Sequence, residues 1–194
     1  MLEHIPAAVG RALQGLRAGM GDIAFNRFDL GAGTGAIQVG SLSFVDHGPI
    51  PARFTADGAG DFPALNWIGV PPEAAALVLL VEDADSPSPH PFLHLSLLNL
   101  APYDGAIAAG DLGQAQLGPT SFFIHRWVPP DPPPGHGPHR YAFQVFALRD
   151  SVQEDSGRSA LLERIGACAL ASGLLVGTYE RSDMQPQMRG PLAA

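Results

Sequence analysis

Acidic and imidazole side chains gather at the ends of apolar, strand-like segments. They are Asp83 and Asp85, which follow one such segment, His94, which lies early in the next, and His139, which precedes a third. Buried strands do not usually end in acids, because an unpaired charge is costly to bury. If the three segments are neighbouring strands, two carboxylates and two imidazoles meet at one rim of a sheet. The pattern therefore indicates a site at that rim.

Three kinds of site could use these side chains. Asp and His are ordinary metal ligands, but no candidate pair has the HxxxH or CxxC spacing typical of metal sites. The second kind is a Ser/His/Asp hydrolase, although Ser86, Ser96 and Ser121 all lie outside any Gly-x-Ser-x-Gly elbow. The third is anion binding, in which the carboxylates orient the imidazoles and raise their pKa, so that the charged form is favoured.

A stiff loop leads into the third of these segments. Residues 129–141 contain six prolines, two glycines and two histidines. Proline fixes φ and lacks an N–H, so this stretch forms neither a helix nor a paired strand. The loop delivers His139 to the sheet, and the backbone N–H groups of Gly135 and Gly137 could add donors for an anion.

The elements that must position these residues are mostly strands. Extended segments are predicted at 37–44, 51–55, 76–81, 92–100, 141–148 and 174–180. The continuous apolar run at 76–81 suits a strand that is buried on both faces. Helices are predicted at 4–20 and 158–172, the second ended by Gly173. We therefore expect a mostly β protein with peripheral helices, a sandwich of antiparallel or mixed sheets. Residues 1–21 would form an N-terminal helical segment and residues 22–194 the sandwich domain.

The N-terminal helix has a narrow apolar stripe. Ile5, Val9, Leu13 and Leu16 recur at helical spacing, with only two arginines in the segment. This pattern favours packing on its own domain or on a dimer partner over contact with a membrane. A homodimer is therefore one expectation.

The composition limits the classes of partner. Of 194 residues, 46% are hydrophobic and 15% are charged, and the net charge is -8. An acidic chain does not suit nucleic acid, which needs a basic face, nor docking to an anionic membrane through surface charge. No segment reaches the roughly 18 apolar residues of a membrane span, and no signal-peptide pattern is present. We expect a cytoplasmic protein without an integral membrane segment.

Two local features have an ordinary structural interpretation. Residues 31–36 are rich in glycine but lack the lysine and the spacing of a nucleotide-binding loop, so a plain loop is predicted. Cys168 lies in an apolar helical setting, which predicts a buried small side chain rather than a reactive thiol. No cofactor is expected.

The motifs together resemble those of the phosphatidylethanolamine-binding protein family, in particular its bacterial, Raf-kinase-inhibitor-like branch. The first is Asp83-Ala84-Asp85-Ser86-Pro87 followed by His94, and the second ends in Gly137-Pro138-His139-Arg140-Tyr141. The stretches 63–71 and 177–181 are also similar to family segments. The resemblance runs in consistent order from about residue 62 to residue 181.

The resemblance implies a β-sandwich with a small anion pocket at one end. It places Asp83, Asp85, Pro87, His94, Pro133 and His139 on family pocket positions. Arg140 falls on an arginine with a structural role. Family members bind phosphate-like headgroups, some inhibit kinases or serine proteases, and catalysis is not their accepted role.

The chain departs from the family pattern at two places. Ala84 replaces a proline between the two acids, and residues 125–131 replace a glycine-rich stretch. Asp131 would oppose an anion if it were buried and unpaired, and Arg126 could offset it.

The leading expectation is therefore a non-catalytic binding protein with a pocket for a small anion or phosphate headgroup. The first alternative is a protein–protein regulator that acts through residues 121–138, with Trp127 beside Arg126 as an interface anchor. A weaker alternative is a hydrolase with His139 as the base.

Overall fold

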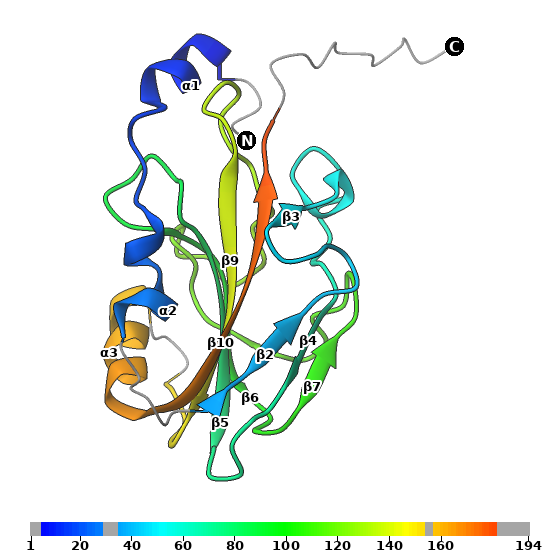
Figure 1. The fold of residues 1–194 in the computed structure, drawn as a ribbon, viewed down its shortest axis with the longest axis vertical. Helices are drawn as coiled ribbons and strands as arrows, with labels where there is room; N and C mark the ends of the chain where they lie inside the picture. Colours follow the sequence, from blue (N-terminus) through cyan, green and yellow to red (C-terminus); the bar gives the residue numbers. More distant parts are fainter. Residues whose placement is uncertain (1–4, 29–34, 154–156, 182–194) are drawn as a thin grey trace.

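Two β-sheets pack face to face, and helices cover the outer face of the larger sheet (Figure 1). In the computed structural model, residues 5–28, 35–153 and 157–181 are described. The helical elements are α1 (Ala7–Leu13), the short 3₁₀ helix η2 (Met20–Asp22), α2 (Ala24–Arg27), the 3₁₀ helix η3 (Ala52–Phe54) and α3 (Arg158–Cys168). The strands are β1 (Gly35–Ala36), β2 (Gln38–Gly40), β3 (Gly48–Pro49), β4 (Leu65–Ile68), β5 (Ala76–Asp83), β6 (Phe92–Leu100), β7 (Gly105–Ile107), β8 (Gln116–Leu117), β9 (His139–Leu148) and β10 (Ala169–Tyr179).

The larger sheet places the three predicted site-bearing strands side by side. Its order is β1-β10-β9-β5-β6-β8, and β3 also pairs with β10. β9, β5 and β6 are antiparallel neighbours, whereas β1 and β3 pair with β10 in parallel. The smaller sheet, β2-β4-β7, is antiparallel. The predicted mostly β sandwich of mixed sheets is confirmed.

Alternating residues of β5 build two separate cores. Leu77, Leu79 and Val81 belong to the core between the two sheets. Val78 and Leu80 face the other way and pack with residues of α2 and α3. The continuous apolar run is thus a strand buried on both faces, as predicted. Each such side chain stabilises the fold by about 1.5–3 kcal/mol through its burial.

The predicted C-terminal helix is shorter than expected. α3 ends at Cys168, and the next four residues already belong to β10, where Ala171 pairs with Ala147 of β9. The long partner strand therefore overrides the helical pattern of these residues. Gly173 does not end a helix but lies within the strand. A Cβ at Gly173 would meet the carbonyl oxygen of Ile37 at 2.2 Å, so glycine allows this close crossing of two backbones.

The predicted N-terminal helix is also shorter. Within the described part of residues 4–20, α1 is the only α-helix, and Met20 begins the 3₁₀ helix η2. The helix stops because the following backbone binds elsewhere: the N–H groups of Ala18 and Gly19 donate to the carbonyls of Ser86 and Ala84, at 3.1 and 2.6 Å. The segment therefore packs on its own domain, which is one of the two arrangements that the sequence favoured.

Several smaller predictions can also be compared with the structure. Within the predicted strand 37–44, only β2 forms a strand. The predicted extended piece 51–55 is wrong, because the 3₁₀ helix η3 occupies its middle. The hydroxyl of Thr55 donates to the Ala52 carbonyl and stabilises this turn. Most of the glycine-rich loop at 31–36 lies outside the described residues. Cys168 is buried, as predicted. Among the helices that the structure describes, none has the length and apolar character to cross a bilayer.

We expect Gly173→Ala to destabilise the protein, by about 1–3 kcal/mol, because the added methyl group must displace the Ile37 backbone. Urea unfolding followed by circular dichroism measures the change. Gly15→Ala is the matched control, since an added Cβ there meets nothing within 4 Å, and its effect should stay within about 0.5 kcal/mol. Equal stability of the two variants would contradict the close crossing.

Candidate functional site

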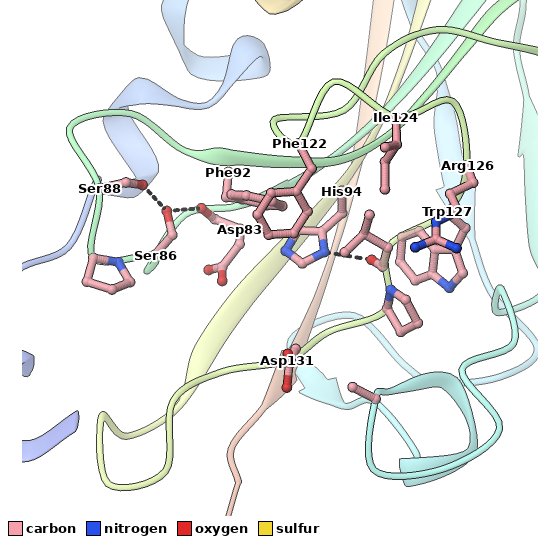
Figure 2. A pocket seen from close by; sticks show the side chains of 14 residues that line it. Asp83, Ser86, Ser88, Phe92, His94, Phe122, Ile124, Arg126, Trp127 and Asp131 are labelled. Atoms are coloured by element: carbon pink, nitrogen blue, oxygen red, sulfur yellow. Dashed lines mark hydrogen bonds between the residues drawn. The ribbon is translucent and has the colours of Figure 1, made fainter. Parts of the chain in front are cut away.

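A pocket of about 700 Å³ lies where β5 and β6 meet the long loop that leads to β9 (Figure 2). Asp83 ends β5, and Phe92 and His94 come from β6. The lining residues are Ala56, Asp83, Ser86, Pro87, Ser88, Phe92, His94, Phe122, Ile124, Arg126, Trp127, Val128, Pro129 and Asp131. Three of the eight predicted site residues, Asp83, Pro87 and His94, therefore line it.

Strand register explains why these side chains share one place. Asp83 pairs with Phe92 on one side and with Tyr141 on the other. His94 is the extra residue of a β-bulge, because Val81 pairs with Leu95 and Glu82 with Leu93. A bulge places two successive side chains on one face, so His94 points to the same side as Leu95, towards the pocket.

His94 is a buried, neutral imidazole. Its Nδ1 lies 2.7 Å from the carbonyl oxygen of Val128, which can only accept, so Nδ1 carries the proton. Burial lowers the pKa of His94, and the nearby Asp83 raises it by less. The carboxylate thus acts in the expected direction, but desolvation dominates, so the expectation of a favoured charged form is wrong for His94. Neutral His94 keeps a lone pair on Nε2 and can accept a hydrogen bond there.

Asp83 begins a buried chain of hydrogen bonds that ends at α1. Its Oδ2 lies 2.7 Å from His139 Nδ1, and His139 Nε2 lies 2.6 Å from His136 Nδ1. His136 Nε2 then donates to the carbonyl of Leu13, at 2.9 Å. Asp83, His136 and His139 are all buried. The chain joins the pocket to the N-terminal segment.

The number of protons in this chain follows from its two ends. The Leu13 carbonyl and the Asp83 carboxylate both accept, so three hydrogen bonds need three protons on the four ring nitrogens. Two neutral imidazoles carry only two. The two rings therefore hold one positive charge opposite Asp83. Burial lowers the pKa of His136, and His139 and Arg17 lower it further.

Asp85 fixes the loop rather than lining the pocket. Its carboxylate accepts from Arg140 N, Nε and Nη2 at 2.7–2.9 Å and lies 3.1 Å from Arg17 Nη1. Burial alone would raise the pKa of Asp85, but the hydrogen bonds from Arg140 and Arg17 outweigh it and lower the pKa. This agrees with the structural role expected for Arg140. Asp83 Oδ1 closes the same turn by accepting from the backbone N–H of Asp85, at 2.8 Å.

The second half of the proline-rich loop faces α1 instead of the pocket. Gln14 Nε2 donates to the Gly135 carbonyl at 2.8 Å, and Arg17 donates to the carbonyls of His136 and Pro138. Gly137 lies against the Arg17 side chain, with φ 90°. Pro133, Gly135 and Gly137 are absent from the residues that line the pocket. Their assignment to a ligand stays a prediction.

Asp131 lines the pocket but has a buried partner. Its Oδ1 lies 2.8 Å from Arg181 Nη1, and Arg181 also binds Asp57 at 2.8 Å. Tyr179 donates its hydroxyl to Asp57, at 2.6 Å. The repulsion of an anion by Asp131 is therefore weaker than that of an unpaired carboxylate. The exposed Arg126 at the rim adds a positive charge.

Aromatic walls and Tyr141 were missed by the sequence reasoning. Phe92 contacts both His94 and Phe122, with ring centroids 4.9 and 4.7 Å apart. Tyr141 lies between the site histidines, 5.3 Å from His94 and 6.4 Å from His139 by ring centroids, and its buried hydroxyl has no hydrogen-bond partner among the described residues. The period of two in β9 was the available signal, since it puts His139 and Tyr141 on one face.

The geometry bears on the metal alternative too. Within residues 5–28, 35–153 and 157–181, no three His, Cys, Asp or Glu side chains are grouped closely enough to hold a metal ion. The buried nitrogens of His136 and His139 are already used in hydrogen bonds.

Comparisons with known proteins point to one family. The family model described as phosphatidylethanolamine-binding protein matches residues 40–180. A UPF0098 protein of Chlamydia trachomatis is 33% identical over 151 residues, which cover 75% of this chain and 99% of the relative. A UPF0098 protein of Methanothermobacter thermautotrophicus is 33% identical over 147 residues, or 72% and 95% of the two chains.

Solved structures show the same fold. The phosphatidylethanolamine-binding protein homologue CT736 of Chlamydia trachomatis superposes with a TM-score of 0.70 at 34% identity, over 75% of this chain and 98% of that one. Escherichia coli YbcL, described as a member of the mammalian family, gives a TM-score of 0.68 at 22% identity over the same shares. The β-sandwich and the family resemblance expected from the motifs are both confirmed.

Asp83→Asn should destabilise the protein by about 3–5 kcal/mol, because it leaves the charged imidazole pair buried without its counter-charge. Chemical unfolding measures the loss. Asp150→Asn is the control, since Asp150 pairs with Arg164 at the surface, and it should cost at most about 1 kcal/mol. A loss as small as that of the control would show that the pair holds no charge.

The pKa of His94 gives a pH dependence with a defined sign. Its folded-state pKa lies below the unfolded value of 6.5, so the unfolded chain binds more protons and the free energy of unfolding falls as the pH drops below that value. His94→Asn, whose amide nitrogen takes the place of Nδ1 and can still donate to Val128, should reduce this slope, by at most about 1.4 kcal/mol per pH unit. Unfolding curves at several pH values between 5 and 7.5 test it, and an unchanged slope would refute a neutral His94.

Proposed function

The chain belongs to the phosphatidylethanolamine-binding protein family, and from that premise we propose that it is a non-catalytic binding protein whose pocket holds a small phosphate headgroup. The observation that carries the proposal is the buried pair of Asp83 and His94 at the inner end of a mainly apolar pocket. A volume of about 700 Å³ suits a small molecule, because such sites measure about 300–1,000 Å³.

The inner end of the pocket favours a ligand that donates hydrogen bonds. His94 Nε2 is an acceptor when the ring is neutral, and the oxygens of Asp83 are acceptors as well. A bare phosphate would meet lone pairs there, whereas an ammonium group would meet partners. We therefore refine the expected ligand from a simple anion to a phosphate headgroup that also carries an amine.

The two ends of the pocket differ in charge in the way such a headgroup needs. In Figure 2, Asp83 lies on one side of His94 and Arg126 on the other. Arg126 can bind the phosphate with charge-assisted hydrogen bonds, while Asp83 faces the ammonium. The rings of Phe92 and Phe122 line the same space and can attract a cation over their faces.

The hydrogen bonds of the imidazoles support a binding role rather than catalysis. Both ring nitrogens of His139 are used, by Asp83 and by His136, so this histidine is not available as a base for a substrate. Ser86, the serine beside Asp83, has its hydroxyl bound to the Asp83 carbonyl and to Ser88 rather than to an imidazole. This arrangement gives no support to the hydrolase alternative.

The alternative of a protein regulator anchored by Trp127 also loses support. The partly buried indole packs edge-on against Phe62, with centroids 5.2 Å apart, and covers the core between the sheets. A side chain that is already packed against its own core is not free to enter a partner.

We expect phosphorylethanolamine to perturb the imidazole signals of His94 in NMR titrations, and to bind more tightly than either ethanolamine or inorganic phosphate alone. Arg126→Gln should weaken the binding at least about tenfold, because a charge-assisted hydrogen bond is lost. Arg149→Gln, which alters an exposed arginine just beyond the other end of β9, is the control and should bind as the wild type does. No perturbation at millimolar ligand, at pH 6 and at pH 7.5, would overturn the proposal.

A further inference from the structure

We propose that the loop tip formed by Phe122, Phe123 and Ile124 inserts into the surface of a lipid bilayer, so that the pocket takes its headgroup from a membrane lipid. The proposal rests on the headgroup function proposed above and names the source of the ligand. It is carried by the exposure of the tip, its continuity with the pocket and its charge.

The loop tip holds an aromatic side chain in water at a cost to the fold. Phe123 is 86% exposed and Phe122 49% exposed. Phe123 also has φ 58°, a left-handed backbone conformation that a bulky residue rarely adopts. Asparagine or glycine would suit this position better. Folding alone therefore does not explain a phenylalanine here.

The loop tip is held firmly in this position. The backbone N–H of Phe123 donates to the Thr120 carbonyl at 2.9 Å, and that of Thr120 donates to the Ile124 carbonyl at 3.0 Å. Ser121 binds Leu93 of β6 twice, through its backbone N–H at 3.0 Å and its hydroxyl at 2.8 Å. Because these hydrogen bonds hold the tip against the sheet, its aromatic rings already project outward and need no ordering before they contact a surface.

The apolar surface of the loop tip continues into the pocket. Phe122 and Ile124 both line it, and the Phe122 ring contacts Phe92, which in turn contacts His94 (Figure 2). A lipid whose headgroup reaches Asp83 must leave its acyl chains at the mouth of the pocket. Phe122 of the loop tip is exposed where it lines the pocket, and Phe123 is its neighbour in the chain, so a bilayer surface would meet the tip and the pocket together.

The charge around the loop tip suits a phosphate-covered surface. The chain carries a net charge of -8, yet no acid occurs between Asp111 and Asp131. The ionisable residues of that stretch are His125 and Arg126, and both are exposed. A negatively charged lipid surface would repel the acidic remainder of the molecule, whereas this side carries no acid, which favours docking through the loop tip.

The size of the loop tip favours a bilayer over a protein partner. A stable protein interface buries about 800 Å² on each partner. Two partly exposed phenylalanines offer a fraction of that area, since a whole aromatic side chain buries about 150–250 Å². A few apolar rings inserted at the headgroup level are sufficient for reversible membrane contact.

Co-sedimentation with vesicles of phosphatidylcholine and phosphatidylethanolamine tests the proposal. Phe123→Asn should lower vesicle binding at least about tenfold while keeping the binding of soluble phosphorylethanolamine, because Phe123 does not line the pocket. Its thermal stability should equal or exceed that of the wild type, since asparagine tolerates the left-handed backbone. Phe123→Trp should retain vesicle binding. Leu42→Asn, which alters a side chain that is 95% exposed on another loop, is the matched control and should bind vesicles as the wild type does.

The possible outcomes separate the two proposals. If the wild type binds phosphorylethanolamine but no vesicles, or if Phe123→Asn binds vesicles as well as the wild type, the membrane proposal is overturned and the headgroup function stands. If vesicle binding depends on Phe123 but the protein binds no phosphorylethanolamine, the headgroup function is overturned and the membrane contact of the loop tip stands. Self-association of the wild type in sedimentation velocity that Phe123→Asn abolishes, without vesicle binding, would assign the tip to a protein contact and overturn the proposal.

Discussion

The carboxylate of Asp83 holds together the end of the large sheet. One oxygen accepts the Asp85 N–H and closes the turn after β5, and the other binds His139 at the start of β9. Through His139 it also reaches His136 and the backbone of α1. A single buried acid thus shapes the turn, joins two neighbouring strands and sets the charge next to the pocket.

Other buried charges in this region follow the same rule of pairing. Glu82 points away from the pocket, where it binds Arg158 of α3 at 2.7 Å and the backbone N–H of Ala24 in α2 at 2.7 Å. Arg181 is buried between two carboxylates, those of Asp57 and Asp131. Such pairs add little net stability, since desolvation offsets their attraction, but breaking one is costly. Their effect is to fix where helices and loops attach to the sheet.

The sequence predicted the parts of the fold that local pattern determines. The apolar runs at 76–81, 92–100 and 141–148 are strands, and they are neighbours as the site required. The predicted C-terminal ends of both helices were wrong, because residues distant in the sequence determine where the helices stop. β9 pairs with the residues after α3, and the turn after β5 accepts hydrogen bonds from the residues after α1. Such long-range pairing leaves no periodic signal in the segment that it reshapes.

The candidate site was predictable in its acids and histidines but not in its walls. Proximity of Asp83, His94 and His139 followed from three strands ending together. The bulge at His94 could not be foreseen, since it depends on a one-residue offset between partner strands. The proline-rich loop was predicted to be stiff, yet stiffness gives no direction: Pro129 and Asp131 line the pocket, while Gly135 and Pro138 contact Gln14 and Arg17.

The contacts of α1 with that loop indicate that the cooperatively folded unit of the protein begins before the residues that match the family. The family match starts at residue 40, well after α1. Leu13, Gln14 and Arg17 nevertheless supply hydrogen bonds to the loop beside the site, and the backbone at Pro134 leaves no room for a side chain at Gly10. A fragment cut to the matched residues would keep both signature motifs, at 83–94 and 137–141, and still expose the far end of the histidine chain to solvent. The boundary drawn by homology and the boundary drawn by hydrogen bonding therefore differ in this protein.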